Sequence, residues 1–437
     1  MTTPVKAVRG TRDLLPPETA LWSRVEAIAR EVFARYHFGE IRTPVFEETA
    51  LFARGVGEET DIVSKEMYTW EDRARAQSEK NQSLTLRPEN TAGVVRAYIE
   101  HKLGETGQLQ KLFYIGPQFR RERPQKGRYR QFFQIGAEVI GPPHAGSESP
   151  LRDAEVLEML ATLLDQLGIT GWTLRLNSVG SASDRPVYLA RLREALAPVV
   201  SQMCADCQRR AVTNPLRVLD CKVPEDQPLI DRLPRIADSL DEASRAHFAA
   251  VCAALDAAQV PYTLDHRLVR GLDYYTRTTF EFTHGGLGAQ NALLGGGRYD
   301  GLSESLGGPR APGIGFAIGQ DRLILTLEAQ QPAQSTLADA FLAPIGEAQN
   351  PAALALAREL RRAGFSVELG DGSFRVRKSL EVADKLARHV ILLGEDELQS
   401  GILTVKHFAT GEQTKVPRAQ LAAHLLARRA QPLTTEG

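Results

Sequence analysis

A cationic segment between two apolar runs is the part of this sequence best suited to chemistry. From Arg120 to Arg130 there are six cations and one anion, Glu122, which gives a local charge of +5 in a chain whose net charge is −1. The apolar runs Leu112–Ile115 and Phe132–Ile135 flank the segment, and this pattern predicts a hairpin with a cationic loop. Because a guanidinium group offers a planar fork to phosphate, the segment favours polyanion binding over its alternative, an ordinary solvated loop.

Four segments, taken in order, resemble one family. Phe119–Glu122, with the sequence FRRE, resembles motif 2 of the class II aminoacyl-tRNA synthetases. Arg270–Tyr275 (RGLDYY) and Gly295–Gly301 (GGGRYDG) resemble signatures of histidyl-tRNA synthetases, and Gly313–Arg322 resembles class II motif 3, with Asp321 where Glu is more common. FRRE alone would be a weak signal, but four segments in this order are specific, and the resemblance covers nearly the whole chain.

The resemblance implies a ligase that works in two steps on L-histidine, ATP and tRNA(His), with Mg²⁺. The carboxylate of histidine attacks the α-phosphate of ATP, which gives histidyl-adenylate and pyrophosphate. The 3′ end of the tRNA then attacks the activated carbonyl. Because both partners of the first step are anionic, the site must supply fixed positive charge and alignment.

The resemblance also implies roles for individual residues. Arg120 and Arg270 are expected to be catalytic and to hold the α-phosphate from two sides. The residues expected to bind ATP are Arg120, Glu122, Arg128, Phe132 and Arg322. The residues expected to bind histidine are Glu89, Thr91, Gln134, Glu138, Arg270, Tyr274, Tyr275 and Tyr299. The residues expected to bind tRNA are Arg123, Gln125, Arg377, Lys378 and Lys385.

These residues have structural alternatives. An isolated arginine can form a surface salt bridge, Phe132 can be a core residue, and Glu138 can be a buried carboxylate with its hydrogen bonds satisfied. In the functional interpretation, Glu138 and Tyr275 contact the imidazole, and Arg322 and Phe132 lie on the two faces of adenine. A carboxylate and a phenol would select imidazole, because a wrong ligand would leave a buried polar group unpaired.

Three cysteines raise the question of a metal. Cys204 and Cys207 form a CxxC pair and Cys221 follows, so a four-ligand zinc site would need Cys252 or a distant histidine such as His247. Because a second CxxC is missing, we expect no metal and independent cysteines in a helical segment. The sequence also contains no GxxxxGK[ST], which excludes a P-loop.

The composition is that of an ordinary globular protein with more than one domain. Hydrophobic residues make up 43% and charged residues 24% of 437 residues. No run reaches the roughly 20 apolar residues that span a bilayer, and MTTPVKAVRG lacks the apolar core of a signal peptide. With only four cysteines, we expect a cytoplasmic protein without a membrane segment. Contacts with nucleic acid must come from local patches.

The N-terminal elements bear on assembly. Apolar residues recur at helical spacing from Leu21 to Tyr36, after the Pro16–Glu18 start, and Glu40–Pro44 is typical of a strand. A helix, a strand and a proline in this order resemble class II motif 1, which implies a homodimer. The alternative is an amphipathic helix packed on a sheet.

The remaining elements predict two domains. Residues 1–328 are expected to form an α+β catalytic core, an antiparallel sheet flanked by helices, with a helical insertion at about 181–261. Residues 329–336, AQQPAQST, are typical of a linker. Alternating strands and helices over 337–437 predict an α/β domain with a largely parallel sheet, in the position of the family's anticodon-binding domain. Its helix Arg377–Arg388 has a net charge of +2, and Arg73–Gln82 is predicted to be a mobile loop.

Two other functions stay open. A catalytically silent paralogue would bind histidine and regulate histidine biosynthesis, but such chains resemble the core alone and lose ATP-site arginines. This chain keeps Arg120, Arg270 and Arg322 and continues for about a hundred residues past the linker. A synthetase for another amino acid is the second alternative, and RGLDYY argues against it.

Overall fold

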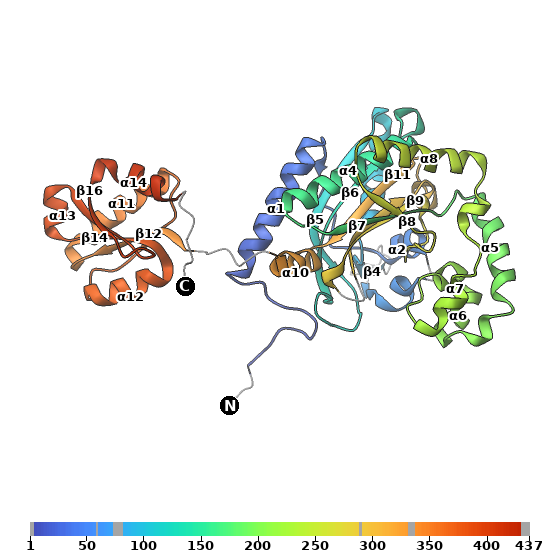
Figure 1. Cartoon of the computed structure of the whole chain (residues 1–437), viewed down its shortest axis with the longest axis horizontal. Helices are drawn as coiled ribbons and strands as arrows, with labels where there is room; N and C mark the ends of the chain where they lie inside the picture. Colours follow the sequence, from blue (N-terminus) through green and yellow to red (C-terminus); the bar gives the residue numbers. More distant parts are fainter. Residues whose placement is uncertain (1–3, 58–59, 73–81, 288–290, 331–336, 430–437) are drawn as a thin grey trace, which may run out of the picture. The chain divides into compact units, whose positions relative to one another are not determined.

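In the computed structural model of this protein, residues 4–57, 60–72, 82–287, 291–330 and 337–429 are described (Figure 1). The chain divides into two compact units, Met1–Pro332 and Ala333–Gly437. The division falls within the stretch predicted as a linker, although helix α10 (Gln320–Gln330) takes its first two residues. Residues 331–336 of that linker and 73–81 of the predicted mobile loop lie outside the described residues.

Unit 1 is built on an eight-stranded sheet. In spatial order its strands are β1 (Gly39–Glu40), β5 (Gln110–Phe119), β6 (Gln131–Ile140), β11 (Gly313–Gly319), β10 (Ala292–Arg298), β9 (Thr276–His284), β7 (Trp172–Ser178) and β8 (Tyr262–Leu264). The six central strands are antiparallel, as predicted, whereas β1 and β8 pair in parallel with β5 and β7. Each parallel pair spans a long connection that contains helices, which is what parallel pairing requires.

Helices α1 (Glu18–Arg35), α4 (Pro150–Leu167) and α8 (Glu242–Ala257) contribute to the main apolar core, and α4 packs against both others. Helix α1 begins directly after the two prolines, and Trp22, Val25 and Phe33 on its inner face are buried. The strand predicted at Glu40–Pro44 is much shorter. The guanidinium group of Arg87 donates to the carbonyl oxygens of Thr43 and Pro44. These backbone groups therefore bond to a side chain and not to a neighbouring strand.

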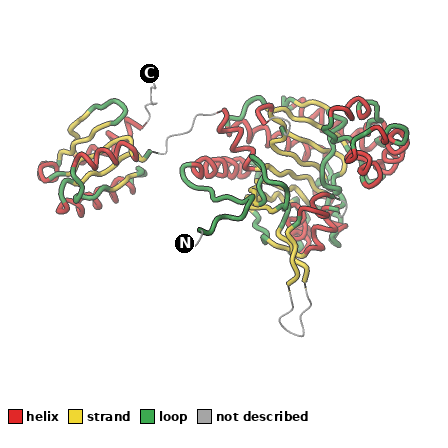
Figure 2. The backbone as a smooth tube through the Cα atoms, turned by 90° about the horizontal axis from the view of Figure 1, so that it is seen from below, coloured by secondary structure: helices red, strands yellow, loops and turns green. Residues whose placement is uncertain are grey.

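A second sheet of unit 1 has three antiparallel strands in the order β2 (Phe46–Glu48), β4 (Gln82–Leu86) and β3 (Tyr68–Asp72). In Figure 2 the pair formed by β3 and β4 projects from the rest of the unit. Helix α2 (Thr49–Val56), a π-helical turn at Ile62–Glu66 and helix α3 (Thr91–Glu100) accompany this sheet, and α9 (Leu302–Ser305) packs on α2 and α3.

The predicted insertion is helical, and its packing divides it in two. Figure 1 shows α5 (Asp184–Leu196), α6 (Ala205–Thr213) and α7 (Gln227–Ile230) grouped at one end of unit 1. They share an apolar cluster whose members run from Val179 to Leu240 and include Tyr275. Helix α8, which lies inside the predicted range of about 181–261, instead packs on α4 in the main core.

Unit 2 is an α/β domain with one mixed sheet. Its strand order is β13 (Val367–Leu369), β12 (Ala338–Pro344), β14 (Ala387–Leu393), β15 (Ile402–His407) and β16 (Gln413–Pro417). The first two pairings are parallel, but β15 and β16 form an antiparallel hairpin on β14, so the sheet is less parallel than predicted. Its helices are α11 (Asn350–Arg362), α12 (Val376–Leu386), α13 (Glu395–Ser400) and α14 (Leu421–Arg429).

The predicted basic helix is shorter than expected. Helix α12 ends at Leu386 and the chain passes directly into β14. As part of this strand, Ala387, Val390 and Ile391 are fully buried in the core of unit 2. Arg388 therefore lies in a strand, and the helix itself has a net charge of +1 instead of the +2 expected for Arg377–Arg388.

Candidate active site

A cavity of about 660 Å³ lies between the sheet of unit 1 and the insertion. Strands β6, β10 and β11 form one wall, and the segments Arg217–Lys222 and Arg267–Gly271 form another. Eight cations line it: Arg120, Arg128, Arg175, Arg217, Lys222, Arg267, Arg270 and Arg322. Six acidic residues also line it, so the cavity is rich in fixed charge of both signs and has a cationic excess.

The predicted hairpin is formed by β5 and β6, and its loop is tied down. The backbone N–H of Arg120 donates to the carbonyl oxygen of Arg130 at 2.9 Å, and Gln125 and Arg128 exchange two backbone hydrogen bonds at the tip. Arg128 also pairs with Glu122 at 3.1 Å. The solvated-loop alternative therefore fits only the exposed part of the segment, because Arg120, Glu122 and Arg128 face the cavity.

Arg120 is held at the end of β5 by two contacts. Its Nε donates to the carbonyl oxygen of Pro88 at 2.9 Å, and its guanidinium carbon lies 5.3 Å from the ring centre of Phe132. The Phe132 ring thus supports Arg120 from the cavity wall, through a cation–π contact that the sequence did not predict.

Arg270 lies over β10 on the insertion side of the cavity. Its Nη1 pairs with Glu281 of β9 at 2.7 Å, and its Nε has no partner among the described residues. A Cβ atom at Gly295 would lie 2.6 Å from Nη1 of Arg270, so the first glycine of GGGRYDG makes room for this guanidinium group. Gly297 does the same for the ring of Tyr275.

Arg322 comes from the first turn of α10. Its Nη1 donates to the carbonyl oxygen of Ala292 at 3.0 Å, and burial, followed by repulsion from Arg128, lowers its pKa. The preceding Asp321 accepts from the backbone N–H of Phe133 at 3.4 Å and pairs with Arg12 at 3.1 Å. Aspartate at this position therefore joins α10 to β6.

Glu138 lies in β6, opposite Gly315 of the neighbouring strand β11, and is fully buried. Its carboxylate accepts hydrogen bonds from the hydroxyl groups of Thr91 at 2.8 Å and Tyr299 at 2.7 Å. Burial raises the pKa of Glu138 to about 8, which the two hydrogen bonds oppose only in part. A Cβ atom at Gly315 would overlap the carboxylate, so glycine at this position of motif 3 is a requirement of the Glu138 site.

Glu89 caps helix α3. Its carboxylate accepts from the backbone N–H groups of Thr91 at 2.8 Å and Ala92 at 3.0 Å, while burial raises its pKa. Gln134 is 8% exposed and its Oε1 has no partner among the described residues. An N–H group of a ligand would satisfy that oxygen.

The predicted histidine-binding residues fall into two groups. Gln134 and Arg270 line the cavity. The others form a polar cluster that interacts electrostatically with Arg120 and Arg270. Its members are the buried Glu89, Thr91, Glu138, Tyr275 and Tyr299 and the half-buried Tyr274. The rings of Tyr274 and Tyr275 lie 4.7 Å apart, and those of Tyr274 and Tyr299 lie 6.0 Å apart.

Two residues that support the site were not predicted from the sequence. Glu281 orients Arg270, and in the sequence it is a single acid between two phenylalanines. Arg298 is fully buried and pairs with Asp153, which fixes the strand that presents Tyr299. A buried arginine gives no signal in sequence that separates it from a surface one.

The residues predicted to contact tRNA are exposed. Arg123 and Gln125 lie at the tip of the hairpin loop, and Arg377, Lys378 and Lys385 lie on α12. Exposure is compatible with binding of a large anion, and these roles stay predictions.

Three of the cysteines are not independent, contrary to expectation, because the fold gathers them around a carboxylate. Cys204, Cys207 and Cys221 lie together with Asp226, whereas neither Cys252 nor His247 joins them. His247 is hydrogen-bonded to Asp153 at 2.9 Å instead.

A cationic cavity on an antiparallel sheet, with the motif 2 hairpin beside the motif 3 strand, defines a class II aminoacyl-tRNA synthetase. The family profile described as histidyl-tRNA synthetase matches residues 10–323, and that of the anticodon binding domain matches 339–428. The chain belongs to the histidyl-tRNA synthetase family. The predicted family and fold class are therefore confirmed.

Relatives match along almost the full length. The chain is 69% identical to the histidine–tRNA ligase of Koribacter versatilis, over 96% of both chains. It is 56% identical to that of Solibacter usitatus, over 96% of this chain and 99% of the relative. The crystal structure of apo S. aureus histidyl-tRNA synthetase is 38% identical and superposes with a TM-score of 0.77, over 97% of this chain and 100% of that one. Among the described residues, no helix combines the length and apolarity needed to cross a bilayer.

Proposed function

We propose that this chain activates L-histidine with ATP and transfers it to tRNA(His). The observation that carries the proposal is the arrangement of Arg120 and Arg270 in one cavity, beside the buried Glu138 cluster. Two guanidinium groups can offset the negative charge of a carboxylate and an α-phosphate. The buried polar cluster suits a small polar side chain. The match of the anticodon binding domain supports tRNA as the acceptor.

In the proposed first step, Arg120 and Arg270 hold the reacting anions in line. Arg120 is fixed through Pro88, and Arg270 through Glu281, so little reorganisation is needed when charge develops on the α-phosphate. The unpaired Nε of Arg270 is a donor that a phosphate oxygen can accept from.

ATP is proposed to bind with its adenine near Phe132 and Arg322, which line the same cavity. Mg²⁺ typically binds one or two carboxylates together with phosphate oxygens. Glu66 lines the cavity and would supply such a carboxylate, whereas Glu122 and Glu281 already pair with Arg128 and Arg270. When bound, the ion would neutralise part of the triphosphate charge.

Histidine recognition is proposed to use the buried cluster and Gln134. The free Oε1 of Gln134 and the carboxylate of Glu89 suit the α-ammonium group, with Thr91 beside them. An imidazole N–H donating to Glu138 would lower the raised pKa of this carboxyl group and favour its ionised form.

We also propose a homodimer in the cytosol. Phe46 and Trp70 of the three-stranded sheet are exposed, as is Val45 directly before β2. The two rings lie 6.0 Å apart, so a second copy could cover an apolar face there. The four cysteines form no disulfide, which suits a reducing compartment. Light scattering on the purified chain tests the dimer, and a monomer at all concentrations would contradict it.

The experiment that tests the function is ATP–pyrophosphate exchange with each amino acid in turn. Exchange should require histidine and Mg²⁺, and charging should require tRNA(His). Exchange with a different amino acid, or none with histidine, would overturn the proposal.

A further inference from the structure

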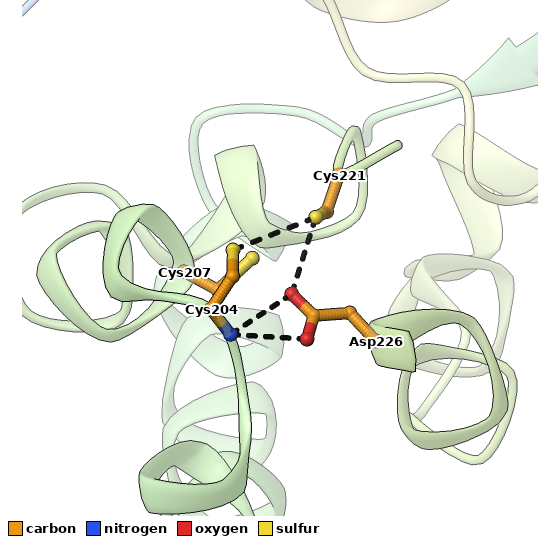
Figure 3. A group of neighbouring side chains, drawn as sticks. All are labelled: Cys204, Cys207, Cys221 and Asp226. Atoms are coloured by element: carbon orange, nitrogen blue, oxygen red, sulfur yellow. Dashed lines mark hydrogen bonds between the residues drawn. The ribbon is translucent and has the colours of Figure 1, made fainter. Parts of the chain in front are cut away.

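Three thiols and one carboxylate converge in the insertion, away from any role in the proposed reaction. Cys204, Cys207, Cys221 and Asp226 each offer one ligand atom, and these atoms all lie within 4.8 Å of one another. Figure 3 shows the four side chains turned toward a common centre. Cys207, Cys221 and Asp226 are at most 4% exposed, and apolar side chains of the insertion surround them.

The local structure brings these groups together from three short elements. Cys204 is the N-terminal cap of α6 and Cys207 lies in its first turn. Cys221 follows the turn at Pro215–Val218, and Asp226 ends the turn at Pro224–Asp226. CxxC at a helix start followed by a third cysteine is a spacing that metal sites use.

The distances suit one tetrahedral ion. With metal–sulfur bonds of about 2.3 Å, two sulfur ligands of a tetrahedral zinc ion lie about 3.8 Å apart. The Sγ atoms of Cys204 and Cys221 are 3.9 Å apart, and Sγ of Cys221 is 3.2 Å from Oδ2 of Asp226. Three thiolates exclude hard cations such as Ca²⁺ and Mg²⁺, and a carboxylate as fourth ligand suits zinc.

Backbone groups already support the ligand atoms. The N–H of Cys204 donates to Oδ1 of Asp226 at 3.0 Å, and the N–H of Val223 donates to Sγ of Cys221 at 3.4 Å. Such second contacts orient ligands and offset part of the negative charge that three thiolates and a carboxylate would bring to one ion. The cluster consists of three thiols and a buried carboxylate, and none of its members is a cation. A metal ion would supply the positive charge that the buried carboxylate lacks.

We propose that Cys204, Cys207, Cys221 and Asp226 bind one structural Zn²⁺ ion. The site is closed, because four protein ligands complete the tetrahedron and leave no position for substrate. Its role is to hold α6 and the two turns together within the insertion.

The proposed ion also braces one wall of the cavity. Cys221 belongs to the cavity-lining segment Arg217–Lys222. Gln227, next to Asp226, donates to the carbonyl oxygen of Cys221 at 3.0 Å and accepts from Arg267 at 2.7 Å. Arg267 begins the lining segment that ends with Arg270 and Gly271, so the metal site and the insertion wall form one hydrogen-bonded unit.

The test measures metal in the full chain, purified under reducing conditions, supplied with Zn²⁺ and desalted. We expect about one zinc per chain by elemental analysis, and a loss to below about a tenth in Cys207→Ser. Asp226→Asn keeps the shape but removes the charged ligand, and should weaken zinc retention. Cys252→Ser is the matched control, because Cys252 lies outside the cluster, and it should retain the metal.

Replacement by Co²⁺ gives a readout that does not depend on folding of a variant. The wild-type chain should show a thiolate-to-cobalt charge-transfer band and the visible bands of a tetrahedral ion. Zinc release should lower the thermal unfolding midpoint of the chain. Less than about a tenth of a zinc per chain, an octahedral cobalt spectrum, or a Cys204–Cys221 disulfide in freshly purified protein would each overturn the proposal. So would equal metal loss in Cys252→Ser.

Discussion

The charged side chains of the cavity and those of helix α12 have similar sequence signals and different surroundings. Arg120 is held by the Pro88 carbonyl at 2.9 Å and by the Phe132 ring. Arg377 on α12 is 91% exposed and pairs with Glu381 at 3.2 Å, one turn along the same helix. A charge run in sequence therefore says where cations are, but not whether they are held in place.

The difference matters for the anion that each region suits. A held guanidinium group is preorganised for a small anion whose charge changes during reaction. Exposed side chains on a helix attract a large polyanion through many weak contacts, which salt screens. Cations that are held in place, as in the cavity, raise the rate of a reaction. Exposed cations, as on α12, contribute a binding affinity that depends on ionic strength.

Removing unit 2 is the strongest way to test this separation. A chain ending at Pro332 should keep histidine-dependent pyrophosphate exchange, because the cavity and its apolar core lie within unit 1. It should lose tRNA charging almost completely, as measured by transfer of labelled histidine to tRNA(His). Charging at the rate of the full chain would show that unit 2 does not bind the tRNA.

Arg120→Ala and Arg270→Ala should each slow adenylate formation by a factor of about 10²–10³, which corresponds to about 3–4 kcal/mol of lost transition-state stabilisation. The measurement is single-turnover adenylation at saturating ATP and histidine. Lys126→Ala is the matched control, since it removes an exposed cation from the same loop and should leave this rate unchanged. A rate near that of the wild type in either arginine variant would contradict its role.

Glu138→Gln tests the buried end of the site. The amide presents a donor where the carboxylate accepts, so we expect the KM for histidine to rise by about tenfold, which is the loss of one buried hydrogen bond to a charged group. The KM for ATP should change little. A rise in the KM for ATP alone would place Glu138 outside the imidazole pocket.

The raised pKa of Glu138 also predicts a pH dependence of stability. Between an unfolded pKa near its ordinary 4.5 and a folded pKa of about 8, only the folded chain holds this proton. The contribution to stability is therefore full below about pH 4.5 and is lost as pH rises to about 8, by at most about 1.4 kcal/mol per pH unit. Urea midpoints across that range should fall relative to those of Glu138→Gln, and a constant difference would contradict the shift.

How much of this the sequence predicts depends on whether the signal is local. The hairpin around Arg120 was predicted because apolar runs flank a charged loop, and the start of α1 because two prolines precede it. The short length of β1 was not predicted, because the carbonyl oxygens of Thr43 and Pro44 accept hydrogen bonds from Arg87, which lies far from them in the sequence. The boundary at Leu386 depends on the core of unit 2 in the same way.

The same contrast holds for the site. The arginine positions come from motifs, but the partners that hold them come from tertiary contacts, as Glu281 does for Arg270. The cysteines show it most clearly. From their spacing we expected independent cysteines, because a fourth ligand would have had to come from Cys252 or a distant histidine. The fold instead places Asp226, five residues after Cys221, beside the three thiols.

The smallest expected effect is on α12, where single exposed cations should matter little. Arg377→Ala should weaken tRNA binding a few-fold and reduce the slope of log affinity against log salt by about one, because about one phosphate contact is lost. The matched control is Arg358→Ala, an exposed arginine of the same unit on α11, which should leave both quantities unchanged. Binding measured by filter retention at several salt concentrations separates the outcomes. If Arg377→Ala weakens binding without changing the slope, the side chain acts through α12 and its pairing with Glu381, and the helix is a scaffold for the unit; if neither quantity changes, the tRNA contacts lie elsewhere on unit 2.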